Sequence, residues 1–211
     1  MQLRPDIQIQ SVMKSLKDVV LPALDPNNNL ALEQGQLIMG MLHVMSQRLP
    51  LEYRFDCDEL ARLLELSSRL RDELTGGDET AAAIEGLRVS RDRGADVLDR
   101  ARAEPSEVYG AVKELRSKIA RVVQCVSKDG DGPSRVAMAA SVRAASAEQL
   151  KRDRAWVIGQ GWEPDPTAIP SIESLLTPRV AAKSASSPRP RRPPAKRAAR
   201  APGATGAAHD T

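Results

Sequence analysis

Apolar residues recur along most of the chain at spacings of three and four, the period of amphipathic α-helices. No stretch shows a convincing alternation of apolar and polar residues that would predict a strand. Residues suited to helix ends stand at the borders of the periodic segments, such as Pro105 at an expected first turn and Gly76 after an expected last turn. The pattern predicts six helices, at about 5–24, 28–48, 56–75, 78–103, 105–127 and 133–157.

The expected connections between these helices are short, which favours antiparallel neighbours and therefore a helical bundle. A short apolar turn at 172–176 follows the last long helix and is expected to lie against the bundle as a strap, residues 159–176. From residue 177 onward the chain is rich in Pro, Ala, Arg and Ser and has little to bury. The sequence therefore predicts an all-α antiparallel bundle, residues 1–176, and a disordered basic tail, residues 177–211.

Two segments carry the strongest apolar stripes. One runs along 108–126, with Val108, Val112, Leu115, Ile119, Val122 and Val126 spaced alternately by about four and three. It fits the bundle core or a dimer surface, and the core is favoured because a bundle needs such a stripe. The other is the arc of Leu30, Leu37, Ile38, Met41, Leu42, Met45 and Leu49 on the second helix, which is also expected to face a core.

Composition narrows the class of protein. Aromatic residues make up only 2% of the chain and Cys57 and Cys125 are its two cysteines, which excludes a disulfide scaffold. The N-terminus has no apolar run of the kind found in signal peptides, and no uncharged apolar stretch approaches the roughly 18 residues of a membrane span. We expect a soluble, cytoplasmic protein.

Charge is distributed unevenly. Residues 179–211 hold eight Lys or Arg residues against one acid, a net charge of +7, whereas residues 1–178 have a net charge of −4. Such a basic, proline-rich segment favours attachment to nucleic acid or to an acidic protein surface, although a solubilising tail would look the same. The candidate contact residues are Arg189, Arg191, Arg192, Lys196, Arg197 and Arg200.

The stretch 39–45 resembles a soft-metal site because it holds three methionines and His43. At 100° per residue, however, Met41 and Met45 point away from Met39 and His43, so one ion cannot be enclosed by this helix. We therefore interpret Met41 and Met45 as core residues, and Met39 and His43 as a pair on the outward side of the helix. No cofactor or metal is expected.

Three other motifs resemble functional sites but also fit simpler structural roles. The sequence "GGDE" at 76–79 lacks the context of a diguanylate cyclase and is expected to end one helix and begin the next, with Asp78 or Thr80 as the cap. Asp129 and Asp131 begin like a calcium loop, but Pro133 and Ala140 stand where ligands are needed, which indicates a turn. Cys57 is expected in the first turn of a helix, where a thiolate is favoured, but no histidine is near it in the sequence.

Residues 3–75 resemble the start of short helical proteobacterial proteins that are associated with aminoglycoside-phosphotransferase-like kinases and acyl-CoA dehydrogenases. The resemblance includes no catalytic motif and implies an accessory role beside acyl-CoA or hydroxy-acid metabolism. The basic tail also resembles that of phasins, the helical coat proteins of polyester granules.

These observations predict a non-catalytic interaction protein or accessory subunit with a protein partner, in which a homodimer is one option. Nucleic-acid binding through the tail is the first alternative and a phasin-like coat protein the second. An enzyme is not expected, because the chain offers no catalytic constellation.

Overall fold

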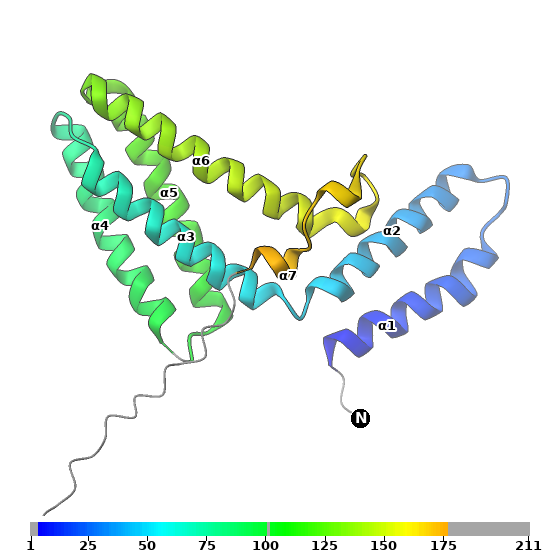
Figure 1. The fold of residues 1–211 in the computed structure, drawn as a ribbon. Helices are drawn as coiled ribbons and strands as arrows, with labels where there is room; N and C mark the ends of the chain where they lie inside the picture. Colours follow the sequence, from blue (N-terminus) through cyan, green and yellow to red (C-terminus); the bar gives the residue numbers. More distant parts are fainter. Residues whose placement is uncertain (1–3, 101, 177–211) are drawn as a thin grey trace, which may run out of the picture. The chain divides into compact units, whose positions relative to one another are not determined.

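A computed structural model describes residues 4–100 and 102–176, which belong to one compact unit and form an all-α fold (Figure 1). The long helices are α1 (Pro5–Ser15), α2 (Asn29–Arg48), α3 (Glu52–Glu73), α4 (Asp78–Asp99), α5 (Pro105–Asp129) and α6 (Gly132–Val157), and a short α7 (Ile172–Leu175) follows. A π-helical segment (Leu16–Val20) and a 3-10 turn (Leu21–Ala23) extend α1, and further 3-10 turns lie at Ile158–Gln160 and Pro166–Ala168. Among the described residues, no helix is both long and apolar enough to cross a membrane.

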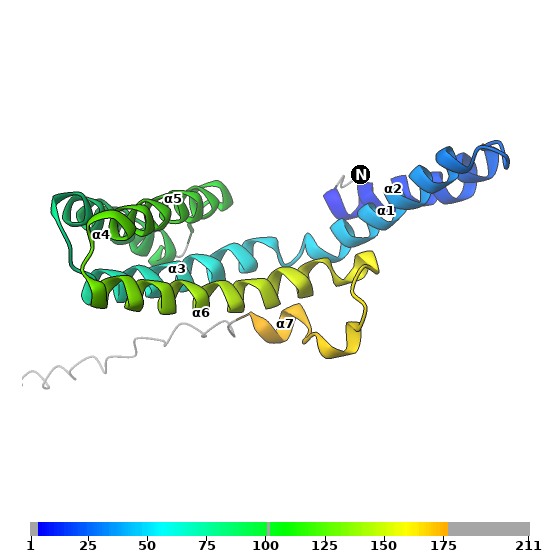
Figure 2. The ribbon, with the colours of Figure 1, turned by 90° about the horizontal axis from the view of Figure 1, so that it is seen from above.

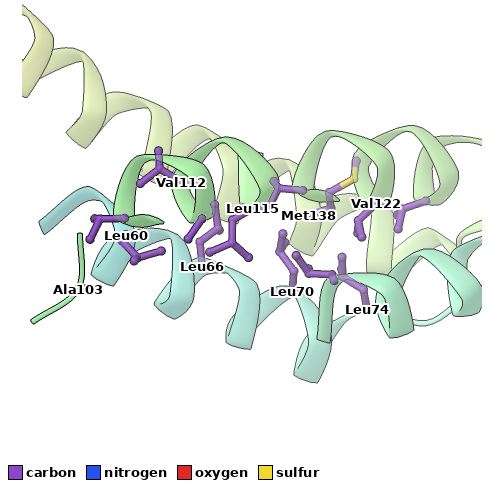
Figure 3. Close-up of a cluster of buried hydrophobic side chains, with 14 residues drawn as sticks. Leu60, Leu66, Leu70, Leu74, Ala103, Val112, Leu115, Val122 and Met138 are labelled. Atoms are coloured by element: carbon purple, nitrogen blue, oxygen red, sulfur yellow. The ribbon is translucent and has the colours of Figure 1, made fainter. Parts of the chain in front are cut away.

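Helices α3 to α6 share the main hydrophobic core (Figure 3). Helices α4 and α5 run antiparallel, as the contacts of Ser90 with Glu114 and of Glu79 with Arg121 show. Helices α3 and α6 also run antiparallel, because Thr75 contacts Ser134 at one end and Asp58 contacts Arg152 at the other. The stripe on 108–126 is buried along its whole length, which confirms that it belongs to the core. The other large side chains buried in this core are Leu60, Leu66, Leu70, Leu74, Leu87 and Met138.

The turns α3–α4 and α5–α6 are tied together at one end of the bundle. Gly76 and Gly130 form an isolated antiparallel bridge, and the Gly77 backbone N–H donates to the carbonyl oxygen of Asp129 at 3.0 Å. A Cβ atom on Gly76 would lie 2.9 Å from the Gly130 Cα, so this close approach of two backbones requires glycine. The motifs "GGDE" and "KDGDGP" are thus the two halves of one structural clasp.

Helices α1 and α2 form an antiparallel hairpin, in which Gln10 donates to the Ser46 hydroxyl at 2.7 Å. The last turn of α2 is fastened to the end of α6, because Arg48 donates to the carbonyl oxygens of Trp156 and Ala155 at 2.8 and 3.1 Å. Figure 2 shows α3 and α6 side by side, with the hairpin beyond their ends.

The segment after α6 packs back on the bundle as a strap. Ile172 and Leu176 are buried against Ala155, with Phe55 and Trp156 beside them. Trp162 lies in the same segment but is 72% exposed, so the strap is held by its last apolar residues and not by this tryptophan.

Two expectations about the first three helices are wrong. Helix α3 begins at Glu52, not at Asp56, because Phe55 is held by Trp156, with ring centroids 4.4 Å apart, and by the guanidinium of Arg152. The arc of α2 does not face a core: Met41 and Met45 are 58% and 55% exposed, because α1 covers a different side of the helix.

Candidate functional site

A groove with a volume of about 590 Å³ lies between α3, α5 and α6. We call it the groove. Figure 1 shows α5 and α6 diverging from their connecting turn, and the residues that line the groove come from these two helices and from α3. Its floor is built from aliphatic residues of all three helices: Leu63, Leu66, Ile119, Ala120, Val123, Val142, Ala144 and Ala145.

The sequence of α6 explains why the groove is open. Between Met138 and Leu150 this helix has Val142 as its one large aliphatic residue, and most of the other positions are Ala, Ser or charged. Such small side chains cannot fill the space beside α5, which carries the strongest apolar stripe of the chain. The groove is therefore lined by apolar surface that the described residues leave uncovered.

The rim of the groove is charged but balanced. Three arginines and three glutamates line it: Arg62, Arg69, Arg116, Glu59, Glu65 and Glu148. Among the described residues, Arg69 and Glu65 have no ion-pair partner, whereas the other four are paired within the chain. The rim thus offers charges of both signs and no net charge.

A buried ion pair fixes α6 to α3 beyond one end of the groove. Arg152 of α6 pairs with Asp58 of α3, and both side chains are almost fully buried. Arg62 shares the same carboxylate at 3.0 Å and donates to the Leu175 carbonyl oxygen at 3.2 Å, which connects the strap to this cluster. The Arg152 guanidinium also lies 4.9 Å from the centre of the Phe55 ring.

Glu59 is the one nearly buried carboxylate that faces the groove. Burial raises its pKa above the ordinary value, and the neighbouring Arg116, with which it forms an ion pair, opposes this shift. Because Arg116 comes from α5, this pair joins α3 and α5 at the same end at which Arg152 joins α3 and α6. The three walls of the groove are therefore connected through charged side chains.

A second hollow of about 540 Å³ lies at the start of α3 and α5, lined by Glu52, Tyr53, Asp56 and Tyr109 among others. The pKa of Asp56 is raised by burial and by the charge of Glu52. Tyr53 donates to the Ala103 carbonyl oxygen at 3.2 Å, and Lys113 lies over the Tyr109 ring. Both tyrosines thus have partners within the chain, and this hollow has much less apolar surface than the groove.

The tail residues proposed for partner or nucleic-acid binding all lie outside the described residues: Arg189, Arg191, Arg192, Lys196, Arg197 and Arg200.

The described ranges contain no group of three or more His, Cys, Asp or Glu side chains that could hold a metal ion. His43 forms a hydrogen bond of 2.9 Å with Gln47 on its own helix.

The expected position of Cys57 in a first turn is wrong. Since α3 begins at Glu52, Cys57 lies in its second turn and packs against the core cluster, away from the free N–H groups of the helix terminus. The argument for a helix-stabilised thiolate therefore does not hold.

Comparison of the chain with protein-family models, curated proteins and solved structures finds no match. Neither the groove nor the Asp58–Arg152 pair was predicted from the sequence. The signal for the groove was the combination of an alanine-rich middle of α6 with a strongly apolar α5. Such small side chains on one helix cannot fill the space beside the other. Nothing in the sequence signalled the pairing of two residues 94 positions apart.

Proposed function

We propose that this protein is a non-catalytic helical interaction protein whose groove binds an amphipathic helix of low net charge. The observation that supports the proposal most directly is the aliphatic floor of the groove, formed by three helices and left uncovered by the rest of the described chain. Grooves of this kind bind the apolar face of a helix through residues spaced by three, four and seven positions.

The size of the groove supports this class of ligand. It extends along α3 from Glu59 to Arg69, about 15 Å at 1.5 Å per residue, which is the length of roughly three turns of a bound helix. The floor has mostly aliphatic side chains, so the binding free energy comes from burial of apolar surface. The balanced rim disfavours a strongly charged ligand of either sign, because such a ligand faces repulsion from half of the rim charges.

The test is site-specific crosslinking in native extracts. A photo-reactive amino acid replaces Ala120, an exposed residue of the groove floor, and in a matched variant it replaces Ala147, an exposed residue of α6 outside the groove lining. We expect a crosslink from position 120 alone, and mass spectrometry maps it to an apolar helix face of the captured chain. Equal crosslinking from both positions, or none from either, contradicts the proposal.

A second candidate function, electrostatic binding of nucleic acid, is supported by the net charge of +7 over residues 179–211. It is independent of the groove, and it predicts binding that weakens steeply with salt and is lost when residues 177–211 are removed. An accessory role beside an acyl-CoA or hydroxy-acid enzyme is the finer proposal that the resemblance of residues 3–75 suggests.

A further inference from the structure

Helix α2 carries an apolar face that residues 4–100 and 102–176 leave uncovered. We call it the α2 stripe: Leu30, Leu37, Ile38, Met41 and Met45, each between 43% and 67% exposed. At 100° per residue these five side chains fall within an arc of about 100° on one side of the helix. A stripe of this width is typical of a helix that packs against another element.

The partner of the α2 stripe is not α1. Leu21 and Leu24 after α1 lie close to Gly35, which is buried on a different side of α2, about 120° around the helix from Met41. The stripe is thus a second apolar face, in addition to the one that forms the hairpin. Large apolar patches left open on a folded surface mark interaction sites.

The α2 stripe and the groove match in length and in charge. From Leu37 to Met45 the stripe is about 12 Å long and from Leu30 about 22 Å, which covers the roughly 15 Å of the groove along α3. Between Asn29 and Gln47 the helix carries one charged residue, Glu33. A nearly uncharged helix suits a rim whose positive and negative charges balance.

The same chain cannot easily place its own α2 in its own groove. The last turn of α2 is fastened to the end of α6 by the hydrogen bonds of Arg48, and only Leu49–Leu51 separate α2 from α3. A fold-back over α3 would break these hydrogen bonds. A second copy has no such restriction.

We propose that two copies of this chain form a dimer in which the α2 stripe of each copy occupies the groove of the other. The proposal rests on the proposed function, since it names the helix that the groove binds. Each copy offers both a helix and a groove, so the two contacts are equivalent and close the pair. A closed pair leaves neither a stripe nor a groove unoccupied, whereas an open chain of copies leaves one of each unoccupied at its ends.

The test compares four variants of the full chain by light scattering and analytical ultracentrifugation. Met41→Glu places a charge in the α2 stripe, and Ala120→Glu places one in the groove. Their matched controls are Gln36→Glu, an exposed position of α2 outside the stripe, and Ala147→Glu. We expect the unmodified chain and both controls to be dimers, and Met41→Glu and Ala120→Glu to be monomers with unchanged helical circular dichroism.

Mixing the two monomeric variants gives the sharper result. The Met41→Glu chain keeps an intact groove, and the Ala120→Glu chain keeps an intact stripe. The intact stripe can therefore occupy the intact groove, and we expect the mixture to form a heterodimer. Stripe-to-stripe pairing predicts no recovery on mixing, and this result would overturn the proposal. A dimer that survives either single substitution would overturn it as well.

Failure of this proposal is distinguishable from failure of the proposed function. If the unmodified chain is a monomer at all concentrations, the dimer is excluded. Crosslinking from position 120 to a helix of a different protein then leaves the groove as a docking site. If crosslinking from that position is also absent, the results contradict both proposals.

Discussion

Asp129, the last residue of α5, caps the first turn of α4 by accepting hydrogen bonds from Thr80. Its carboxylate accepts from the Thr80 hydroxyl and from the backbone N–H groups of Thr80 and Glu79, at 3.3 and 3.0 Å for the two nitrogens. Helix α4 has no side-chain cap at its own N-cap residue, Gly77. The acceptor that a helix N-terminus needs is thus supplied by another helix.

Asp129→Ala is therefore expected to lower the melting temperature clearly more than Asp78→Ala, although Asp78 is the aspartate at the start of α4. The first substitution removes the acceptor from three donors, and the second removes one exposed carboxylate without a described ion-pair partner. Thermal unfolding followed by circular dichroism measures both. Equal losses would contradict the role of Asp129 as the cap.

The same contacts predict how stability depends on pH. The Thr80 hydroxyl holds the pKa of Asp129 below its ordinary value of 3.8, and the Ser134 backbone N–H and the Thr75 hydroxyl do the same for Asp131. Because both folded-state pKa values are lowered, their stabilisation is present above pH 3.8 and is lost as the pH falls through the lowered values. Asp129→Asn should flatten this acid-side loss of stability, measured as the urea midpoint against pH.

Leu70→Ala is expected to cost about 2–5 kcal/mol, since Leu70 is fully buried in the core of α3 to α6 and its removal leaves a cavity. The matched control is Leu150→Ala, because Leu150 is 58% exposed on α6. We expect the control to stay within about 0.5 kcal/mol of the unmodified protein. Urea denaturation measures both values.

Arg152→Met is expected to cost about 3–5 kcal/mol, because it leaves Asp58 buried without its main partner. Arg143→Met, an exposed arginine on the same helix that donates to the Ala139 carbonyl oxygen, is the matched control and should change stability little. A double variant that also carries Asp58→Leu should recover much of the loss, since the buried charge is then gone. Absence of recovery would contradict the energetic account of this pair.

Truncation after Leu176 is expected to abolish any nucleic-acid binding, because the cationic excess of the chain lies beyond it. Replacing the six tail cations named above with alanine should have the same effect without shortening the chain. For the full chain the logarithm of the binding constant should fall steeply and linearly with the logarithm of salt concentration. Binding that is insensitive to salt, or that survives truncation, would remove the tail from this function.

The helices and the core of α3 to α6 could be predicted from the sequence because spacing alone determines which side chains share a face. The seam from Val108 to Val126 is the clearest example. Spacing does not determine what covers a face, so Met41 and Met45 were assigned to a core although no described element lies over them. The Arg152–Asp58 pair and the cap by Asp129 depend on helix contacts distant in sequence, which periodicity cannot supply.

The clasp between the two turns and the Arg152–Asp58 pair hold α6 at both of its ends. The groove is therefore preorganised, because the distance between its walls is set by the clasp at one end and the ion pair at the other. An incoming helix does not have to arrange these walls before it binds. Most of the conformational entropy cost of binding then falls on the ligand, and a helix that is already folded in its own protein adds little to that cost.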